Sequence, residues 1–310
     1  MPEKVYDVLI IGGGPAGLTA GLYTSRAKLD TLLVERMIMG GQVMTTTKVE
    51  NYPGFPGGID GPDLMVRFQE HCQEFGLQVE YGEVENLIDH GAEKVVVVDG
   101  REVRARCVIV TTGAEPRKLG IPGEQELTGR GVSYCATCDG AFFRGVPVAI
   151  VGGGDTAAEE ALFLTRFASK VFLIHRRDQL RATKVLQDRL AANEKIEILW
   201  NTLVERVEGD ASGLKAAEIK NLVSGERCPL PLEGLFVAVG VTPKAHFLAD
   251  VLTLDADGYI LTDAECRTSI PGVFAAGDVR KKILKQIATA VGDGAVAAIM
   301  AEKYLEDLEG

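Results

Sequence analysis

The sequence predicts an α/β protein that contains two copies of one strand–turn–helix–strand unit, with the second copy inserted into the first. The first observation is that residues 6–35 contain an apolar strand, a glycine-rich turn, a helical segment and a second strand. The second is that adding 140 to any residue number in 8–36 gives its counterpart in a second copy, without a gap. The third is that turn-rich segments near 113–117 and 240–245 flank this second copy, where the chain would cross between two lobes.

The first copy has the features of a dinucleotide-binding turn. In Gly12-Gly13-Gly14-Pro15-Ala16-Gly17 the glycine spacing is G-x-G-x-x-G. The first glycine forms the turn, the second lets the backbone approach a pyrophosphate, and the third lets the helix pack close to the strand. The helix amides then face the phosphates. Glu35 ends the second strand, where an acid binds ribose hydroxyls and repels a 2′-phosphate. This copy therefore favours FAD or NAD over NADP.

The second copy differs at the position that decides between these nucleotides. Its turn is Gly152-Gly153-Gly154-Asp155-Thr156-Ala157, in which alanine is an accepted variant of the third glycine. Where the first copy has Glu35, the second has His175 followed by Arg176 and Arg177, and Arg181 comes shortly after. Guanidinium groups bind phosphate through paired hydrogen bonds. The sequence therefore predicts an NADP(H) site. The alternative is that the arginines are only a solvated basic run on the surface and that the site binds NAD(H).

A redox segment precedes the second copy. Cys135-Ala136-Thr137-Cys138-Asp139 places two cysteines close enough to form and break a disulfide, and places an acid directly after them. A structural zinc site normally needs four Cys or His ligands, usually as two such pairs, and this chain has one close pair. We therefore interpret Cys135 and Cys138 as a catalytic dithiol, with half a zinc site as the weaker alternative, and we predict no metal.

The remaining elements follow from periodicity and turn residues. Residues 61–75 have the apolar spacing of an amphipathic helix that Gly76 ends, and 79–112 alternate as short strands. Residues 120–134 are polar and rich in turns. A helix is predicted over 182–192, short strands over 196–239, a strand over Val273–Ala276 and a last helix from about Gln286 to Leu305.

Composition excludes several classes of function. A chain of 310 residues suits about two domains. Its net charge of −11 offers no basic face to displace counterions, which argues against a nucleic-acid partner. No stretch of 18 or more apolar residues occurs, so no membrane span is expected. The first apolar run enters a glycine turn instead of a cleavage site, so we expect a cytoplasmic protein, where disulfides are mainly catalytic.

Seven segments together resemble the bacterial-type, low-molecular-weight thioredoxin reductases, which are homodimeric flavoproteins. The first three are the Gly12–Gly17 turn, Gly40-Gly41-Gln42 and Val49-Glu50-Asn51-Tyr52-Pro53-Gly54. The other four are Cys135–Gly140, Gly152–Ala157, His175-Arg176-Arg177-Asp178 and Pro271–Asp278. The resemblance covers nearly the whole chain. It departs at Ala141, where the family often has an aromatic residue before Phe142 and Phe143, and at Lys285-Gln286-Ile287, where it often has Arg-Gln-Ala.

The resemblance implies two Rossmann-like (FAD/NAD(P)-binding) domains. The FAD domain comprises 1–114 and 246–310, and the NADPH domain with the redox cysteines comprises 115–245. Besides Glu35 and the first turn, FAD is implied to contact Gly41, Gln42, Asn51, Gly277, Asp278, Gln286 and Ile287. NADPH is implied to contact Gly152, Gly154, Asp155, Thr156 and His175, and its 2′-phosphate Arg176, Arg177 and Arg181. Cys138 is implied to be the sulfur nearer the flavin, and Asp139 the acid and base.

The implied reaction passes electrons from NADPH through FAD and the Cys135–Cys138 disulfide to oxidised thioredoxin. The cysteine pair and the glycine turn for NADPH both lie in the inserted lobe. Only one of them can therefore be next to the single flavin at a time. We therefore expect the lobes to rotate between half-reactions. The alternatives are the same architecture serving another disulfide protein or preferring NADH, and a flavin-binding redox sensor without turnover. A reductase for iron–sulfur partners is disfavoured because it would lack the cysteine pair.

Overall fold

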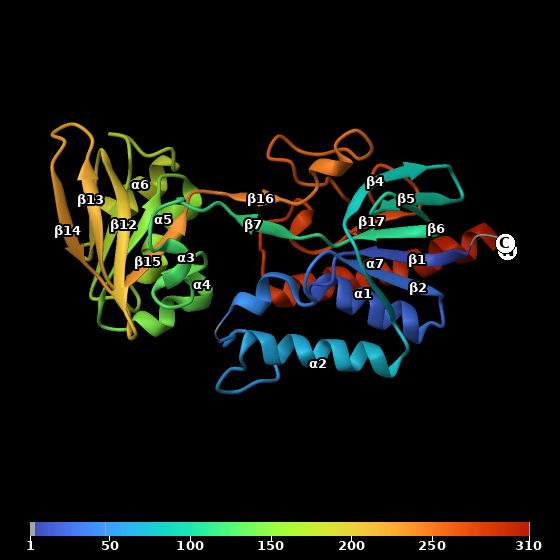
Figure 1. Cartoon of the computed structure of the whole chain (residues 1–310). Helices are drawn as coiled ribbons and strands as arrows, with labels where there is room; N and C mark the ends of the chain where they lie inside the picture. Colours follow the sequence, from blue (N-terminus) through green and yellow to red (C-terminus); the bar gives the residue numbers. More distant parts are fainter. Residues whose placement is uncertain (1–3, 47, 310) are drawn as a thin grey trace. The chain divides into compact units, whose positions relative to one another are not determined.

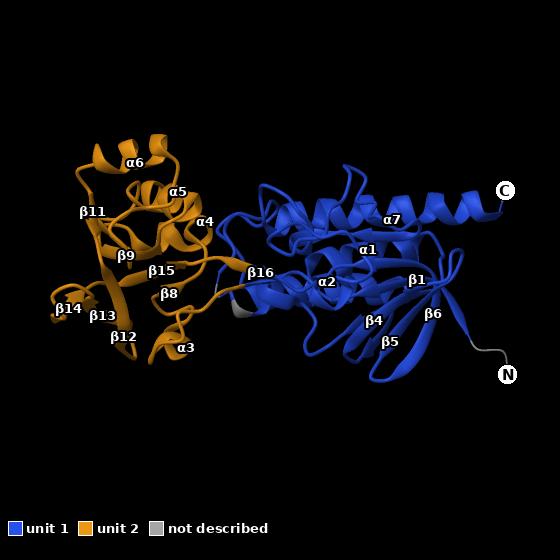
Figure 2. Ribbon diagram, turned by 90° about the horizontal axis from the view of Figure 1, so that it is seen from above, with its two compact units in different colours: residues 1–115, 242–310 blue, residues 116–241 orange. Residues whose placement is uncertain are grey.

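The computed structural model describes residues 4–46 and 48–309, which form two compact units (Figure 2). Unit 1 consists of residues 1–115 and 242–310, and unit 2 of residues 116–241. The chain leaves unit 1, forms unit 2 and returns, so the predicted insertion of one unit into the other is confirmed.

A seven-stranded sheet forms the centre of unit 1 (Figure 1). The elements of unit 1 are β1 (Val5–Ile11), α1 (Pro15–Arg26), β2 (Thr31–Glu35), the 3-10 helix η1 (Gly41–Thr45), α2 (Gly61–Glu74), β3 (Gln78–Tyr81), β4 (Val84–Asp89), β5 (Lys94–Val98), β6 (Arg101–Val110), η3 (His246–Leu248), β17 (Val273–Ala275), η4 (Gly277–Val279) and α7 (Ile287–Glu309). The strand order is β3-β2-β1-β6-β5-β4, and β17 also pairs with β6.

Parallel pairing in this sheet brings distant segments to one edge. Strands β3, β2, β1, β6 and β17 are parallel, whereas β4 and β5 are antiparallel. The long β6 pairs with β5 through its first half and with β17 through its last three residues. The carboxyl ends of parallel strands are where α/β proteins bind ligands. The first glycine turn, Glu35 and Gly277-Asp278 therefore meet at the same edge.

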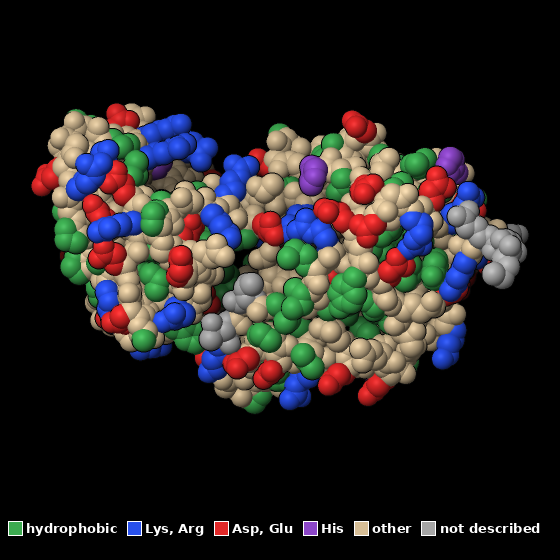
Figure 3. Space-filling model, viewed as in Figure 1, with side chains coloured by type: hydrophobic (Ala, Val, Ile, Leu, Met, Phe, Trp, Pro, Cys, Tyr) green, Lys and Arg blue, Asp and Glu red, His purple; other side chains and the backbone are tan. Residues whose placement is uncertain are grey.

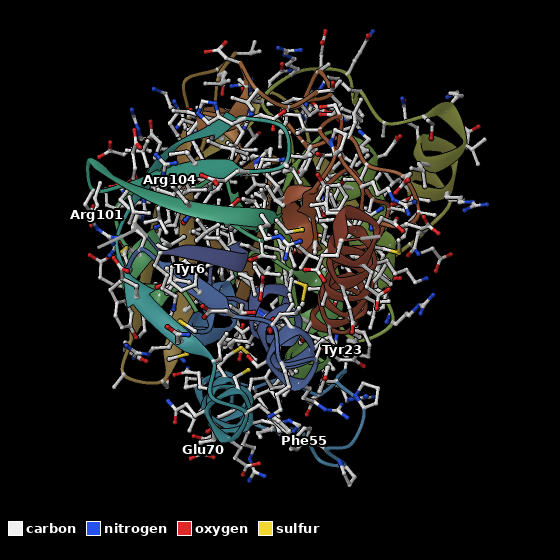
Figure 4. The ribbon with its side chains drawn as sticks, turned by 90° about the vertical axis from the view of Figure 1, so that its right-hand side faces the viewer. Tyr6, Tyr23, Phe55, Glu70, Arg101 and Arg104 are labelled. Carbon is white, nitrogen blue, oxygen red and sulfur yellow. A yellow bond between two sulfur atoms is a disulfide. The ribbon has the colours of Figure 1, made fainter. Side chains whose placement is uncertain are left out.

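The strands of this sheet are apolar on both faces: helices α1, α2 and α7 pack on one face, and residues of β4, β5 and the segment 245–260 pack on the other. Helix α7 packs against α1 so closely that a Cβ at Gly294 would lie 2.3 Å from the Ala16 carbonyl oxygen. Leu18, Ile10 and Phe274 are fully buried in the core between helices and sheet, and each such side chain contributes about 1.5–3 kcal/mol. Toward solvent the surface is polar, as Glu70 on α2 and Arg101 and Arg104 on β6 illustrate in Figure 4.

Unit 2 contains a five-stranded parallel sheet and a three-stranded antiparallel sheet. Its elements are α3 (Glu124–Leu127), β8 (Val132–Ser133), α4 (Ala136–Asp139), η2 (Gly140–Phe143), β9 (Pro147–Gly152), α5 (Asp155–Leu164), β10 (Lys170–Ile174), α6 (Lys184–Ala191), β11 (Ile196–Leu199), β12 (Thr202–Asp210), β13 (Gly213–Asn221), β14 (Arg227–Pro231) and β15 (Gly234–Ala238). The parallel sheet has the order β11-β10-β9-β15-β8.

The same edge rule places the redox segment in unit 2. Strand β8 ends at Ser133, β9 at Gly152 and β10 at Ile174, and all three run parallel in one sheet. The cysteine segment, the second glycine turn and the arginine run therefore all leave the carboxyl edge of this sheet. Short strands β7 (Ala114–Pro116) and β16 (Val241–Pro243) pair where the chain passes between units.

The structure differs from the sequence prediction mainly between residues 120 and 134. This segment contains α3 and β8, although its polar, turn-rich sequence predicts irregular structure. Both elements are short and depend on tertiary contacts, since β8 exists through its pairing with β15. The duplicated unit is confirmed, because β9, α5 and β10 repeat β1, α1 and β2.

The surface is of mixed charge. On the face that Figure 3 shows, acidic and basic side chains are interspersed, and hydrophobic side chains form scattered spots. In residues 4–46 and 48–309, no helix combines the length and the apolar character that a bilayer crossing requires.

Candidate active site

Cys135 and Cys138 form a disulfide at the start of the short helix α4. Their Cα atoms are 5.3 Å apart, within the range that disulfides require. Cys135 is the N-cap residue, and its carbonyl oxygen accepts hydrogen bonds from the amides of Cys138 and Asp139. The part of the chain that the structure describes contains no cluster of three or more His, Cys, Asp or Glu side chains suited to a metal ion. The disulfide itself shows that the two sulfurs are placed for disulfide chemistry.

Asp139 lies on the same helical turn and is held by Ser133. The Ser133 hydroxyl donates to Asp139 Oδ2 at 2.6 Å and accepts from the Cys135 amide at 3.1 Å. Burial raises the pKa of the Asp139 carboxyl above its ordinary value, while the hydrogen bond from Ser133 lowers it. A raised pKa suits a carboxyl that must hold a proton near neutral pH and then release it.

Glu124 anchors the residue before Cys135. Its buried carboxylate accepts hydrogen bonds from the amides of Leu119 and Gly120 at 2.9 and 2.7 Å, and from the Tyr134 hydroxyl at 2.9 Å. Burial, together with this hydrogen bond, raises the pKa of Tyr134 to about 12. Tyr134 therefore stays neutral and serves to fix the start of the redox segment.

A second carboxyl, Glu160, faces α4 from helix α5. Burial raises its pKa to about 7, the hydrogen bond from the Ala136 backbone opposes this, and the charge of Glu159 adds to it. The folded protein therefore favours the protonated form of Glu160 far more than the unfolded chain does. Its contribution to stability is fully present below about pH 4.5 and is lost as the pH rises through about 7.

Replacing Glu160 by glutamine removes this pH dependence. At about pH 8 the Glu160→Gln variant should be more stable than the parent chain, by up to about 3 kcal/mol, because no buried carboxylate forms. Near pH 4.5 the two should unfold alike. Thermal unfolding midpoints across this range measure the difference. Glu194→Gln is the control, since Glu194 is an exposed carboxyl of the same unit that is not among the groups that shift Glu160. A midpoint difference that does not change with pH would contradict the assignment.

The first glycine turn leaves room for a ligand at its second glycine. A Cβ at Gly12 would lie 2.7 Å from the Thr111 carbonyl oxygen, and one at Gly17 would lie 1.9 Å from the Gly12 carbonyl oxygen. A Cβ at Gly14 would meet nothing within 4 Å. Helix α1 has no side-chain cap at Gly14. The turn is thus closed on the protein side and open where a pyrophosphate would lie.

Glu35 stabilises this turn as well as ending β2. Its Oε2 accepts a hydrogen bond from the Gly13 amide at 2.7 Å, and its Oε1 accepts one from Met37 at 3.0 Å. Gly41 lies against the same turn, since a Cβ there would be 3.3 Å from the Gly14 Cα. Pro15 and Ala16 form the first turn of α1.

The other predicted flavin contacts gather around the Gly277-Asp278 turn and the start of α7. Asn51 donates to Gln286 at 2.9 Å, which joins segments 235 residues apart. Ile287 is the first residue of α7. The side-chain amide nitrogen of Gln42 lies 3.5 Å from Glu115 Oε1. Asp278 Oδ1 is buried and has no hydrogen bond among the described residues, although Lys282 Nζ lies 3.7 Å away. A buried acceptor that lacks a hydrogen bond fits the hydroxyl of a bound polyol.

Asp293 supports this turn. One of its oxygens accepts from the Gly277 amide at 3.1 Å and from Lys282 at 3.0 Å, and the other accepts from Arg280 at 3.0 Å. No sequence pattern singles out Asp293, because these contacts join α7 to a preceding loop and follow no periodic spacing.

The second glycine turn repeats the design of the first. A Cβ at Gly152 would lie 2.6 Å from the Ala238 carbonyl oxygen, whereas one at Gly154 would meet nothing within 4 Å. Asp155 Oδ1 accepts a hydrogen bond from the Thr183 amide at 2.6 Å. Thr156, next in α5, is exposed.

His175 serves the turn itself. Its Nδ1 lies 2.8 Å from the Gly152 carbonyl oxygen and its Nε2 lies 2.9 Å from that of Gln179. His175 thus corresponds to Glu35 in position and in its contact with the turn. Arg176, Arg177 and Arg181 are exposed, and no described carboxylate lies within ion-pair distance of them. Three exposed guanidinium groups without acidic partners fit a phosphate.

The two aromatic residues after the redox segment have different environments. Phe143 packs edge-on against Phe236 with ring centroids 5.2 Å apart, inside the core of unit 2. Phe142 is 47% exposed. Only Phe142 is therefore available to a partner, and Ala141 before it is half-buried.

Comparison with known proteins gives a consistent result. Residues 6–294 match the family described as pyridine nucleotide-disulphide oxidoreductase. A thioredoxin reductase of Listeria monocytogenes is 50% identical over 307 residues, which cover 99% of this chain and 96% of that protein. A crystal structure of thioredoxin reductase from Streptococcus pyogenes is 46% identical with a TM-score of 0.95, covering 98% of this chain and 99% of that one. Lactococcus lactis thioredoxin reductase in its FR conformation is also 46% identical, with a TM-score of 0.67 and coverage of 97% and 99%. The chain belongs to the pyridine nucleotide-disulphide oxidoreductases and, within them, to the thioredoxin reductases.

Proposed function

We propose that this protein reduces the disulfide of oxidised thioredoxin, using electrons that NADPH supplies through FAD to the Cys135–Cys138 disulfide. The observation that carries this proposal is that disulfide itself, with a buried acid on the same helical turn. The arginine-bearing nucleotide turn lies at the same edge of the same sheet.

Unit 1 supplies the residues that would hold FAD, and unit 2 those that would hold NADPH. The open side of Gly14 takes the pyrophosphate, Glu35 the ribose, and Asp278 a polyol hydroxyl. Arg176, Arg177 and Arg181 take the 2′-phosphate. When bound, FAD accepts a hydride from NADPH and makes two electrons available to a disulfide. We therefore assign FAD to residues 1–114 with 246–310 and NADPH to residues 115–245, bounds that differ from those of units 1 and 2 only at the two crossings.

The protein's own residues handle the sulfur and proton chemistry. Cys138 is the sulfur nearer the flavin. Asp139 protonates the thiolate that forms when the disulfide opens, and it accepts a proton again when the dithiol attacks thioredoxin.

We further propose that the two units rotate relative to each other between half-reactions. The chain crosses between them twice, and glycines with positive φ lie at both crossings, Gly113 at 73° and Gly240 at 119°. The two solved relatives of equal identity to this chain differ widely in TM-score, which supports two arrangements within the family. Alternating access to one flavin is the reason that this rotation is needed.

A covalent tether that fixes the two units tests the rotation. The tethered protein should retain at most one half-reaction, either reduction of the flavin by NADPH or reduction of the disulfide, and should lose steady-state turnover. Stopped-flow absorbance follows the flavin, and thioredoxin reduction follows turnover. The same variant before the tether is closed serves as the control. Full turnover with the tether closed would refute the rotation.

Anaerobic titration with NADPH tests the function as a whole. The protein should take up about four electrons, two on the flavin and two on the disulfide, and oxidised thioredoxin should then withdraw them. Kinetics with NADPH, NADH and several disulfide proteins decide between this function and a related reductase. Uptake of electrons without any transfer to a disulfide substrate would favour a redox sensor.

We also propose a cytoplasmic homodimer, in line with the family resemblance. Four cysteines outside the redox pair are free thiols, as is usual in a reducing compartment. Sedimentation equilibrium at twice the mass of the chain is the expected result for the dimer, and a monomer at micromolar concentration would contradict it. Fractionation of the source cells tests the cytoplasmic location. Recovery of the protein outside the cytoplasmic fraction would contradict it.

A further inference from the structure

Ser133 is a buried hydroxyl between the redox cysteines and the acid that serves them. It ends strand β8 and is 5% exposed. Its oxygen accepts from the Cys135 amide at 3.1 Å, and its hydrogen points to Asp139 Oδ2 at 2.6 Å. The Cys135 carbonyl oxygen lies 3.4 Å from the same hydroxyl. Ser133 thus has two alternative acceptors for its single hydrogen.

We propose that Ser133 is a positioning residue that holds Asp139 ready for proton transfer to and from the cysteines. When Asp139 is ionised, the hydroxyl donates to its carboxylate. When Asp139 is protonated, the carboxyl donates to the serine oxygen, and the serine hydrogen turns to the Cys135 carbonyl. Both protonation states of Asp139 are therefore hydrogen-bonded, and neither leaves a buried polar group unpaired. The proposal rests on the proposed function, in which Asp139 is the acid and base.

The reaction balances with this arrangement. The hydride of NADPH brings two electrons and one proton, and a second proton comes from solvent. The S–S bond of Cys135–Cys138 breaks, the two electrons reside on the two sulfurs, and both sulfurs end as thiols. Asp139 delivers the second proton and is left as a carboxylate that accepts from Ser133. In the second half-reaction one thiol of the pair gives its proton to Asp139 as its sulfur attacks the protein disulfide, whose S–S bond breaks. The other thiol then closes the Cys135–Cys138 bond, and the partner leaves as two thiols that take up this second thiol's proton and one proton from solvent.

Few other ionisable groups face this site. The neighbouring elements β8, η2, β9 and β15 carry no ionisable side chain. Helix α5, which packs against α4, contributes Asp155, Glu159 and Glu160; Asp155 accepts a hydrogen bond from the Thr183 amide, and Glu160 binds the Ala136 amide. Tyr134 is occupied by Glu124. Ser133 is thus the side chain whose hydrogen bond acts directly on Asp139, and Glu160 is the group that a control must separate from it.

Removing the hydroxyl should shift the titration of Asp139 upward. In Ser133→Ala the carboxylate loses a charge-assisted hydrogen bond, so its pKa should rise by about 1–2 units. Reduction of the disulfide needs protonated Asp139. In single-turnover experiments, the pH above which this reduction slows (its high-pH limit) should therefore rise by the same amount. Attack on thioredoxin needs ionised Asp139, so the low-pH limit of that step should move to higher pH by the same amount, and below this limit the step should slow about 10-fold or more. Loss of packing alone would slow both steps at every pH.

Three variants and a second measurement make the test decisive. Ser133→Thr keeps the hydroxyl and suits a strand, so it should restore the parent profile. Asp139→Asn should abolish the pH limit, and Ser133→Ala should then have no further effect on it. In Glu160→Gln, Ser133→Ala should cause the same shift as in the parent chain. Infrared difference titration of the oxidised holoenzyme, with the Asp139 band assigned by Asp139→Asn, measures the carboxyl without turnover.

The outcomes separate the two proposals. In Ser133→Ala, a shift of the titration midpoint of the Asp139 carboxyl band to higher pH supports the role of Ser133, provided that Ser133→Thr restores the parent midpoint. This holds whether or not thioredoxin is the substrate. If a folded Ser133→Ala protein keeps both the titration midpoint of the Asp139 band and the high-pH limit of disulfide reduction, the role of Ser133 is overturned. Absence of NADPH-dependent reduction of Cys135–Cys138 in the parent chain would instead overturn the proposed function, while the infrared titration still decides on Ser133.

Discussion

Cys138→Ser should lower thioredoxin reduction by at least about 10³-fold, because loss of an active-site nucleophile removes the covalent route entirely. Serine preserves the size and the helix position of Cys138, so the fold of unit 2 should remain. Oxidation of NADPH by a small one-electron acceptor, which takes electrons from the flavin directly, should stay within about twofold. Steady-state assays with thioredoxin and with ferricyanide measure the two activities separately.

Cys228→Ser provides the matched control. Cys228 is an exposed free thiol on β14 of the same unit, so this variant should keep full activity in both assays. Thioredoxin turnover by Cys138→Ser at more than a tenth of the parent rate would show that electrons leave the protein by another route. Equal loss in both assays would show instead that the substitution disturbs flavin binding.

Joint replacement of Arg176 and Arg177 by alanine should raise the KM for NADPH by at least about 100-fold, with little change for NADH. Each guanidinium hydrogen bond to a phosphate is worth about 1.5–3 kcal/mol, and only NADPH carries the 2′-phosphate. Both arginines are exposed and have no described acidic partner, so their removal should leave the fold intact. Steady-state kinetics with the two nucleotides measure the ratio.

Arg166→Ala is the control for this double variant. Arg166 is an exposed arginine of unit 2 that lies over the Phe163 ring, 5.2 Å from its centroid. It should leave the preference for NADPH unchanged. An equal rise of KM for both nucleotides in the double variant would show that the arginines bind a part of the nucleotide that NADH and NADPH share, and not the 2′-phosphate.

The agreement between sequence and structure is strongest where backbone geometry alone decides. The two glycine turns fold alike, with Gly12 and Gly152 against a carbonyl and Gly14 and Gly154 facing open space. These properties follow from the missing side chain and from the strand-to-helix turn, both of which are local. Helix α2 likewise begins and ends near the predicted residues, since apolar spacing and Gly76 specify it.

Predictions about individual side chains were less complete. His175 was expected to contact the nucleotide, and the structure shows both of its ring nitrogens against backbone carbonyls of its own unit. Contact with NADPH therefore stays a prediction for His175, whereas its support of the turn is now visible. Phe142 and Phe143 are equivalent in sequence, but only the packing against Phe236 shows which of them is core.

For the redox segment, the sequence by itself determined the two cysteines, the acid after them and the arginine run that follows the second turn. These are short-range features, and the chemistry of their residue types indicates what they do. Only the tertiary structure decided how they work together. The parallel order β10-β9-β15-β8 brings the redox segment and the arginine run to one edge, and burial at that edge raises the pKa of Asp139. The pairing of β8 with β15 places Ser133 beside Asp139, because contacts between strands depend on sheet order and not on the spacing of residues along the chain.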